Sequence, residues 1–173
     1  MSAERPYKIS TLIYLRNEAD ELLLLQRTKS PNAGLWSPIG GKLEMASGES
    51  PFEAARRETA EEVGLEVDDA DLHLFGMISE KNYEGRVHWL MFLFDCRRRL
   101  TALPTPIGEG RFGFFAPTAL DALAIPATDR KLLWPHYFAH RAGFAAIRVD
   151  CSPGHDLTVV TEQAMPGPAP GAT

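Results

Sequence analysis

The sequence predicts a single α/β domain, because apolar runs typical of β-strands surround a helix with clear signals at both of its ends. The chain has 173 residues, of which 45% are hydrophobic and 24% are charged, enough to bury one core. No repeat or linker divides it. We therefore expect one domain over residues 1–164 and a disordered tail at 165–173, which is rich in Pro, Gly and Ala.

The N-terminal segments predict two strands joined by a polar turn. Residues 8–15 (KISTLIYL) have strand character, and a turn follows at 17–20. Residues 22–26 (LLLLQ) form a continuous apolar run, which is typical of a strand buried on both faces. Residues 30–41 are dense in Pro and Gly, so we expect a loop with tight turns there.

The clearest element is a helix over residues 51–63. Ser50 is the expected N-cap, with Pro51 at the first helical position. Glu53 completes a Ser-x-x-Glu capping box, in which two side chains bond to the free backbone N–H groups of the first turn. Gly64 is the expected terminator.

The second half of the chain predicts mainly strands. Strand character recurs in four segments: 72–79, 87–95, 144–151 and 157–162, the last two forming a hairpin. Residues 108–115 predict a loop that leads into a short strand. A helix is expected over 129–140, with a kink at Pro135. The run Arg97-Arg98-Arg99 follows a strand and favours a solvated turn.

The charge and cysteine content argue against several classes of protein. The net charge is -5, and an acidic protein does not attract nucleic-acid polymers through its overall field. Cys96 and Cys151 lack any CxxC or Cys/His grouping, so we expect reduced packing residues, with a disulfide as the alternative. No signal-peptide run opens the sequence, and no stretch approaches the ~20 apolar residues that span a membrane, so we expect a cytoplasmic protein.

The helix carries an acidic cluster that points to a metal. Glu58, Glu61 and Glu62 have i, i+3, i+4 spacing and therefore share one helix face. They lie near the C-terminal end, where both their mutual repulsion and the helix dipole oppose negative charge. Mg²⁺ removes this conflict, since it binds carboxylates, water and phosphates. The alternative is an exposed, solvated helix face.

The surrounding residues extend this cluster into a motif. From Glu49 to Leu65 the chain reads Glu-x7-Arg-Glu-x-x-Glu-Glu-x-Gly-Leu, preceded by Gly40-Gly41-Lys42. This resembles the Nudix box, Gly-x5-Glu-x7-Arg-Glu-U-x-Glu-Glu-x-Gly-U, where U is a bulky aliphatic residue. Two features depart from the pattern: seven residues, not five, separate Gly41 from Glu49, and Thr59 stands at an aliphatic position.

The resemblance extends beyond the box to the MutT-type branch of Nudix hydrolases. Gly34-Leu35-Trp36 and the isolated Glu109-Gly110 are typical of that branch. The C-terminal part is similar to hydrolases of oxidised purine nucleoside triphosphates. The resemblance implies an α/β/α sandwich built on a mixed sheet.

The resemblance also implies roles for individual residues. Glu58, Glu61 and Glu62 would bind Mg²⁺, with Mn²⁺ as a substitute, together with the Gly41 carbonyl. Arg57 and Glu49 would orient these glutamates. Glu109 would be a further ligand or the base. The metal would neutralise phosphate charge and lower the pKa of a bound water, and a carboxylate would take the proton as the water attacks phosphorus. Which glutamate is the base stays open.

Five other residues are candidates for substrate binding. Arg27 and Lys42 flank the Gly-rich loop and are candidates for phosphate contacts, although each also fits an ordinary surface charge. Trp36 would stack on a base or anchor the loop by packing. Thr128 and Asp129 would read a purine edge or cap the last helix.

The sequence thus favours an Mg²⁺-dependent pyrophosphohydrolase. The expected substrates are nucleoside triphosphates, including oxidised purines such as 8-oxo-dGTP, cleaved to a monophosphate and pyrophosphate. One alternative is a pyrophosphatase of ADP-ribose or another nucleotide sugar. Another is a non-catalytic Nudix module that senses a nucleotide. An isomerase on the same fold lacks a second set of residues to support it. A small-molecule nucleotide is the expected partner, without nucleic-acid polymer or membrane, and a homodimer is the expected assembly.

Overall fold

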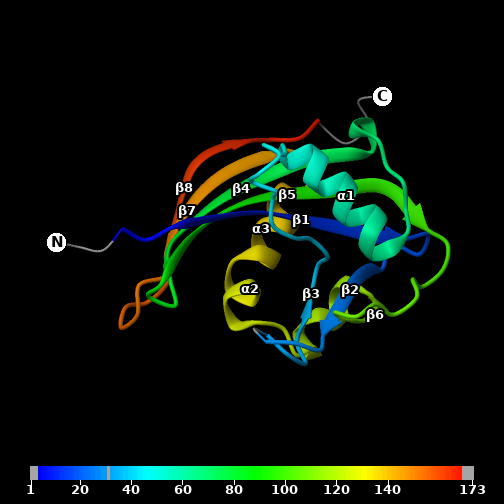
Figure 1. Ribbon diagram of the computed structural model, residues 1–173, viewed down its shortest axis with the longest axis horizontal. Helices are drawn as coiled ribbons and strands as arrows, with labels where there is room; N and C mark the ends of the chain where they lie inside the picture. Colours follow the sequence, from blue (N-terminus) through cyan, green and yellow to red (C-terminus); the bar gives the residue numbers. More distant parts are fainter. Residues whose placement is uncertain (1–3, 31, 169–173) are drawn as a thin grey trace.

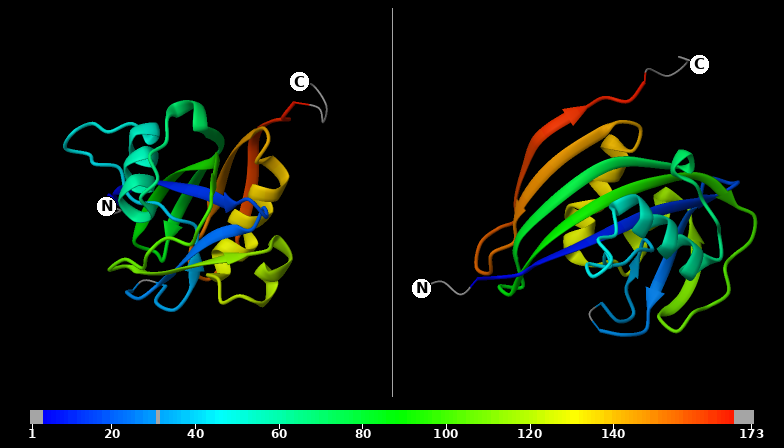
Figure 2. Two further views of the ribbon diagram at one scale, coloured as in Figure 1. Left: turned by 90° about the vertical axis from the view of Figure 1, so that its right-hand side faces the viewer. Right: turned by 45° about the horizontal axis from the view of Figure 1, so that its top comes forward.

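The computed structural model describes residues 4–30 and 32–168, which form a mixed sheet of eight strands between two helical layers. The strand order is β3-β2-β1-β5-β4-β7-β8, and β6 pairs with β2. Helix α1 lies on one face of the sheet, and α2 and α3 lie on the other (Figure 1, Figure 2). The predicted α/β/α arrangement on a mixed sheet is therefore confirmed.

Strands β1 (Tyr7–Asn17) and β2 (Leu22–Arg27) send alternate side chains to the two faces. One hydrophobic core lies under α1 and a second lies under α2 and α3. The four leucines that open β2 are all buried, two in each core: Leu23 and Leu25 under α1, Leu22 and Leu24 under α2 and α3. The run is apolar because both faces of β2 are covered, as predicted.

Helix α1 (Pro51–Val63) has the predicted ends. The Ser50 hydroxyl accepts a hydrogen bond from the Glu53 backbone N–H at 3.2 Å, and the Glu53 carboxylate accepts one from the Ser50 N–H at 2.8 Å. Gly64 closes the helix in the left-handed conformation, at φ 68°, where glycine avoids the strain that a Cβ would cause.

Small residues let α1 approach the sheet closely. Ala54 and Ala55 are fully buried, and the Phe52 ring meets Phe94 of the sheet edge-on at 4.8 Å. Thr59 is also fully buried, and its hydroxyl donates to the Ala55 carbonyl at 2.7 Å. A threonine therefore fits the position where the box has an aliphatic residue, because its polar group is satisfied inside the helix.

Strands β1 and β2 diverge, and the segment after β3 lies in the gap. The only register pair recorded between β1 and β2 in the described residues is Arg16 with Leu22. Beyond it, the Thr11 N–H donates to the Gly41 carbonyl at 2.9 Å, and the Leu43 N–H donates to a β1 carbonyl at 3.1 Å. The Gly-rich segment is thus fixed against β1 by backbone hydrogen bonds, directly beside α1.

The predicted loop at 30–41 also contains a short strand, β3 (Trp36–Ser37), which pairs with β2. The loop prediction missed it because two residues carry no periodic pattern. The opposite edge of β2 pairs with β6 (Gly110–Phe115), the short strand expected within 108–115.

The central strands are longer than predicted. After a 3₁₀ turn, η1 (Asp69–Asp71), β4 spans Leu72–Tyr83 and β5 spans Val87–Leu100. The run Arg97-Arg98-Arg99 lies within β5, so the predicted turn is wrong. Pairing with β1, which includes Arg16 opposite Arg99, keeps this polar run extended, a tertiary effect that composition does not show.

The predicted helix at 129–140 is two helices, α2 (Ala127–Lys131) and α3 (Leu133–His140). The break falls at Leu132, with φ -120° and ψ -64°, and the predicted kink at Pro135 is wrong. Pro135 is the third residue of α3, in the first turn, where a backbone N–H has no partner within the helix. A second 3₁₀ segment, η2 (Pro117–Ala122), precedes this pair.

The C-terminal hairpin is confirmed as β7 (Phe144–Asp150) paired antiparallel with β8 (Thr158–Met165) at one edge of the sheet. The predicted disordered tail begins at Met165, which ends β8, and its residues 169–173 lie outside the described part. Cys96 and Cys151 are both free thiols, as predicted. Among the described residues, no helix is long and apolar enough to cross a bilayer.

Candidate active site

Helix α1 presents its three C-terminal glutamates in three different environments. The side chain of Glu58 is 12% exposed and that of Glu61 is 61% exposed. Glu62 is buried, with 8% of its surface exposed. A uniformly solvated helix face, the alternative drawn from the sequence, would leave all three in water. The structure instead directs two of them into the protein.

Arg57 connects four acceptors around the start of the site. Its Nε and Nη2 bind the two oxygens of Glu49 at 2.8 and 2.9 Å. Nη1 binds Glu58 at 2.7 Å and reaches Glu61 at 3.4 Å, while Nη2 also donates to the Lys42 carbonyl at 3.2 Å. The hydrogen bond from Arg57 lowers the pKa of Glu49, so this carboxylate stays ionised. Arg57 and Glu49 therefore lie where they can orient the glutamates and the Gly-rich loop.

Glu62 is a buried acid without enough partners. Its Oε2 atom has no hydrogen-bond partner in the described residues. Burial, and then the negative charges of Glu58 and Glu109, raise its pKa from 4.5 to about 8. The Gly40 backbone N–H and the positive charge of Arg27 offset this only in part. Such a group is stable as a carboxylate only when a cation approaches it.

Glu58 lies directly against the Gly-rich segment. A Cβ on Gly41 would stand 2.1 Å from the Glu58 Oε1 atom, so a larger residue there would displace this carboxylate from its position. A Cβ on Gly40 would stand 2.1 Å from the Thr11 carbonyl oxygen, and its φ of 146° also favours glycine. Burial raises the pKa of Glu58, against the lowering effect of Arg57. The two glycines thus permit close contact between the backbone and the acidic face of α1.

Glu109 approaches the helical glutamates from the opposite loop. Its negative charge acts on both Glu58 and Glu62, which places the three carboxylates in one region. The Glu109 carbonyl accepts hydrogen bonds from the Thr28 N–H at 2.9 Å and from the Thr28 hydroxyl at 3.1 Å. Gly110 follows, and a Cβ there would stand 2.0 Å from a β2 carbonyl oxygen. The loop backbone is therefore fixed to the end of β2.

These residues fit a divalent cation by their chemistry. The donor set is carboxylate and carbonyl oxygen, which hard cations prefer. The unpartnered Oε2 of buried Glu62 is a feature that such an ion would satisfy, and the Glu58 carboxylate lies directly against Gly41. Within residues 4–30 and 32–168, no three acidic, His or Cys side chains are already close enough to hold a metal as they stand. Glu61 is the exposed member and has the freedom to rotate.

The predicted phosphate contacts lie beside this region. Arg27 ends β2, and its Nε is buried without a partner among the described residues. The positive charge of Arg27 lowers the pKa of Glu62, so Arg27 lies beside the acidic site. Lys42 is exposed next to the Gly-rich segment. Trp36 is 9% exposed and packs edge-on against Phe115 at 4.7 Å, the arrangement expected of a packing anchor.

Thr128 and Asp129 lie within α2 rather than before it. The N-cap of α2 is Pro126, and no side-chain hydrogen bond caps the helix, so the capping alternative is wrong. Burial raises the pKa of Asp129 from 3.8 to about 7. A carboxylic acid that is desolvated in this way is stable either in its protonated form or with a hydrogen-bond donor or cation beside its carboxylate.

Sequence reasoning missed Glu80, a buried acid in β4. It is 4% exposed, and burial, followed by the charge of Asp129, raises its pKa from 4.5 to about 7. The alternation of side chains along a strand could have revealed it. Glu80 lies two residues after buried Ile78 and therefore faces the same core. The strand predicted from the sequence ended at Ser79, one residue before Glu80.

Replacing Glu80 by glutamine should change the pH dependence of stability. Its folded pKa exceeds its unfolded value, so the contribution of Glu80 to the free energy of unfolding is fully present below about pH 4.5 and is lost as pH rises through about 7. Glu80→Gln cannot ionise, so its stability relative to wild type should rise by on the order of 2 kcal/mol across that window. Urea unfolding at several pH values measures this, and parallel curves for the two proteins would contradict it.

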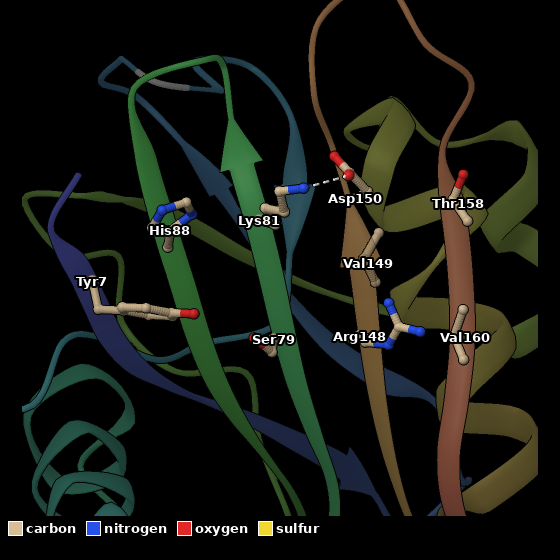
Figure 3. A pocket seen from close by; sticks show the side chains of 9 residues that line it. All are labelled: Tyr7, Ser79, Lys81, His88, Arg148, Val149, Asp150, Thr158 and Val160. Carbon is tan, nitrogen blue, oxygen red and sulfur yellow. Dashed lines mark hydrogen bonds and ion pairs between the residues drawn. The ribbon is translucent and has the colours of Figure 1, made fainter. Parts of the chain in front are cut away.

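A separate hollow of about 490 Å³ lies on the sheet between the start of β1 and the β7–β8 hairpin (Figure 3). Tyr7 and His88 line one side, and Arg148 lies on the other. Lys81 and Asp150 form an ion pair across it at 3.0 Å. None of the predicted site residues lines this hollow, so the acidic region at α1 is distinct from it.

Comparison with known proteins places this geometry in context. The family model of the NUDIX domain matches residues 6–134. The chain is similar to the structure of a mutator MutT protein from Bacillus halodurans, with 25% identity and a TM-score of 0.69, covering 90% of this chain and 97% of that one. It is similar to the MutT protein of Methanosarcina mazei Go1, with 27% identity and a TM-score of 0.65, covering 80% and 98%.

A third structure shares the fold at lower identity. It is the NUDIX domain of Shewanella oneidensis NrtR complexed with ADP ribose, with 14% identity and a TM-score of 0.60, covering 79% of this chain and 88% of that one. The predicted resemblance of the box and of the MutT-type segments is therefore confirmed at the level of family and fold.

Proposed function

The chain belongs to the NUDIX family of pyrophosphate-bond hydrolases, and from this premise we propose that it is an Mg²⁺-dependent pyrophosphohydrolase of nucleoside triphosphates. The observation that carries the proposal is the unpartnered carboxylate of buried Glu62, in the same acidic region as Glu58 and Glu109. Enzymes of this family generally use divalent cations. When bound, the cation neutralises phosphate charge and lowers the pKa of a coordinated water.

The residues of this chain would divide the work as follows. Glu58, Glu61 and Glu62 would hold the cation together with the Gly41 carbonyl. Glu58 and Glu62 need little movement because they already face the Gly-rich segment, whereas Glu61 must turn from solvent. Arg57 would fix Glu58 and, through Glu49, the loop before α1. This preorganisation would orient a bound phosphate group for hydrolysis.

Arg27 and Lys42 would bind the phosphate chain. The Arg27 Nε is buried beside the acidic region without a partner in the described chain, so a phosphate oxygen would supply one. Lys42 is exposed beside the Gly-rich segment and would act as a point charge. For Trp36, packing against Phe115 supports a role in shaping the loop rather than a direct contact with the base.

Glu109 would be the base or a further cation ligand. Replacing it by Gln should lower kcat by ~10²-fold or more, change KM less and leave the melting temperature near the wild-type value. The reason is that the backbone of the loop, not its carboxylate, joins it to β2. The acidic limb of the pH–rate profile should also move.

The measurement is kcat across pH for wild type, Glu109→Gln and the exposed control Glu18→Gln. Glu18 lies in the β1–β2 turn and is exposed, so its variant should behave as wild type. Superimposable profiles for all three proteins would assign Glu109 to a surface role.

A substrate panel tests the proposed function itself. We expect purine nucleoside triphosphates, including 8-oxo-dGTP, to be cleaved to a monophosphate and pyrophosphate, with products identified by mass. ADP-ribose and other nucleotide sugars belong in the same panel, as does an assay for binding without turnover. If ADP-ribose had the highest kcat/KM, the assignment to triphosphates would be wrong. If nucleotides bound without any product with Mg²⁺ present, a sensing module would replace the enzyme.

The remaining expectations belong to the same proposal. We place the reaction in the cytoplasm, with a small nucleotide as the partner and a homodimer as the assembly. Residues 1–164 would act as one domain.

A further inference from the structure

The segment between β5 and β6 carries Glu109 but has little structure of its own. Residues 101–109, all in the described part of the chain, form no helix or strand, and most of them are exposed. The Ile107 N–H donates to the Gly110 carbonyl at 2.9 Å and the Gly110 N–H donates to the Ile107 carbonyl at 3.1 Å, so residues 107–110 form a tight turn. Glu109 is the third residue of this turn. Because these two bonds lie within the turn, contacts with the rest of the protein must fix the position of Glu109.

An apolar contact and a group of hydrogen bonds join the turn to the rest of the protein. The Ile107 side chain packs against the hydrophobic core under α1. The Glu109 carbonyl accepts hydrogen bonds from the Thr28 N–H at 2.9 Å and from the Thr28 hydroxyl at 3.1 Å. The hydroxyl also lies 3.4 Å from the Gly108 carbonyl oxygen. Among the described residues, only these bonds from Thr28 join the 101–109 segment to a partner outside its own turn.

The Thr28 side chain contributes a restraint that the backbone alone does not supply. Any residue except proline would donate the N–H bond at this position, whereas the hydroxyl adds a second donor for the same carbonyl group. The hydroxyl has one hydrogen, so the carbonyls of Gly108 and Glu109 share it. Packing at Gly108 does not replace this restraint, because a Cβ placed there would have no atom within 4 Å. The hydroxyl therefore limits the rotation of the peptide unit that leads into Glu109.

The turn lies beside the acidic region of α1. Arg27, the last residue of β2, is the register partner of Gly110, so the turn adjoins the end of that strand. Glu109 acts as a like charge on the buried Glu62 of α1, and Arg27 acts on the same carboxylate with the opposite sign. The packing of Ile107 against the core under the helix agrees with this placement. A small rotation of the turn would therefore move the Glu109 carboxylate relative to the helical glutamates.

We propose that Thr28 is a positioning residue for hydrolysis, whose hydroxyl holds the 107–110 turn so that the Glu109 carboxylate stays beside Glu62. This inference rests on the proposed function, in which Glu109 is the base or a cation ligand. The Thr28 hydroxyl is occupied by carbonyl groups, so it acts through Glu109 rather than on the substrate. A displacement of the carboxylate by about 1 Å lowers kcat, since proton transfer and cation binding both depend on distance.

The kinetics of Thr28→Val and Thr28→Ser test the role of the hydroxyl. Valine keeps the shape of the side chain and the backbone N–H bond but removes the hydroxyl. We expect kcat to fall roughly three- to tenfold, the effect of losing one neutral hydrogen bond, with KM within about twofold of wild type. Serine keeps the hydroxyl donor and should return kcat to within about twofold of wild type. Thr161→Val, which changes an exposed threonine of β8, is the matched control and should keep wild-type kinetics.

A double-mutant cycle shows whether Thr28 acts through Glu109. In a Glu109→Gln background, Thr28→Val should cause no further loss of kcat, because the carboxylate that the turn positions is gone. Equal fold losses in the two backgrounds would give Thr28 a general structural role and overturn the proposal. Melting temperatures near that of wild type establish that each variant is folded, as expected for exposed positions.

Hydrogen exchange provides a measurement that needs no turnover. The amides of residues 101–110 should exchange roughly two- to tenfold faster in Thr28→Val than in wild type, and at the wild-type rate in Thr28→Ser. Unchanged exchange in Thr28→Val, or faster exchange with wild-type kcat, overturns the positioning role while leaving the hydrolase proposal intact. Absence of hydrolysis by wild type, with the exchange result as expected, refutes the proposed function instead and shows that Thr28 holds the turn without serving this reaction.

Discussion

Chelation of divalent cations is expected to abolish hydrolysis, by at least ~10³-fold, and Mg²⁺ or Mn²⁺ should restore it. A bound cation contributes several kcal/mol of transition-state stabilisation, and a loss of that size lowers the rate by about this factor. Glu58, Glu62 and Glu109 already act on one another as like charges, so an anionic phosphate chain cannot enter their region without a positive ion. The only cation that contacts Glu58 and Glu61 in the described chain is Arg57, and it also binds Glu49.

The measurement is pyrophosphate release from a purine triphosphate with excess chelator, followed by readdition of each metal. A melting curve with and without chelator is the control, since the hydrogen bonds that cap α1 do not involve the acidic cluster. Full turnover in excess chelator would refute the metal mechanism.

Replacing Glu61 or Glu62 by Gln is expected to lower kcat by ~10²-fold or more. Each change keeps the size and helix propensity of the side chain and removes a charged ligand. The two variants should differ in stability. Glu61 is exposed, so its variant should melt near wild type, whereas Glu62→Gln should be more stable above neutral pH, because the buried unpartnered carboxylate is removed.

Glu66→Gln is the matched control, because this glutamate follows α1 and is exposed. Steady-state kinetics and thermal unfolding of the three variants provide the comparison. Near-normal turnover in both Glu61→Gln and Glu62→Gln would restore the solvated-face interpretation of the helix.

The elements that were predicted correctly are those determined by residues close together in the sequence. Helix α1 has its predicted bounds because the Ser50 cap, Pro51 and Gly64 all act within a few residues of the ends. The acidic cluster was also readable, since i, i+3, i+4 spacing fixes a shared face. These features need no knowledge of the rest of the chain.

The features that the sequence did not predict depend on distant partners. Arg97 to Arg99 continue β5, which regains its pairing with β1 at Arg99 opposite Arg16. The break at Leu132 has no Gly or Pro at that position to signal it. Glu80 was missed because the predicted strand ended at Ser79, whereas β4 continues to Tyr83. Only the β4 register with β5 and β7 shows that it faces the core.

The Gly-rich segment and α1 are anchored independently of the loop that joins them. Upstream, the Leu43 N–H bonds to the Ile9 carbonyl of β1. Downstream, Ser50 caps α1 through Glu53. Insertions between these two anchor points need not displace either one, so a longer connection is compatible with the same spacing of residues within the helix. A sequence search that demands one fixed gap before the first box glutamate would therefore overlook chains with this longer connection.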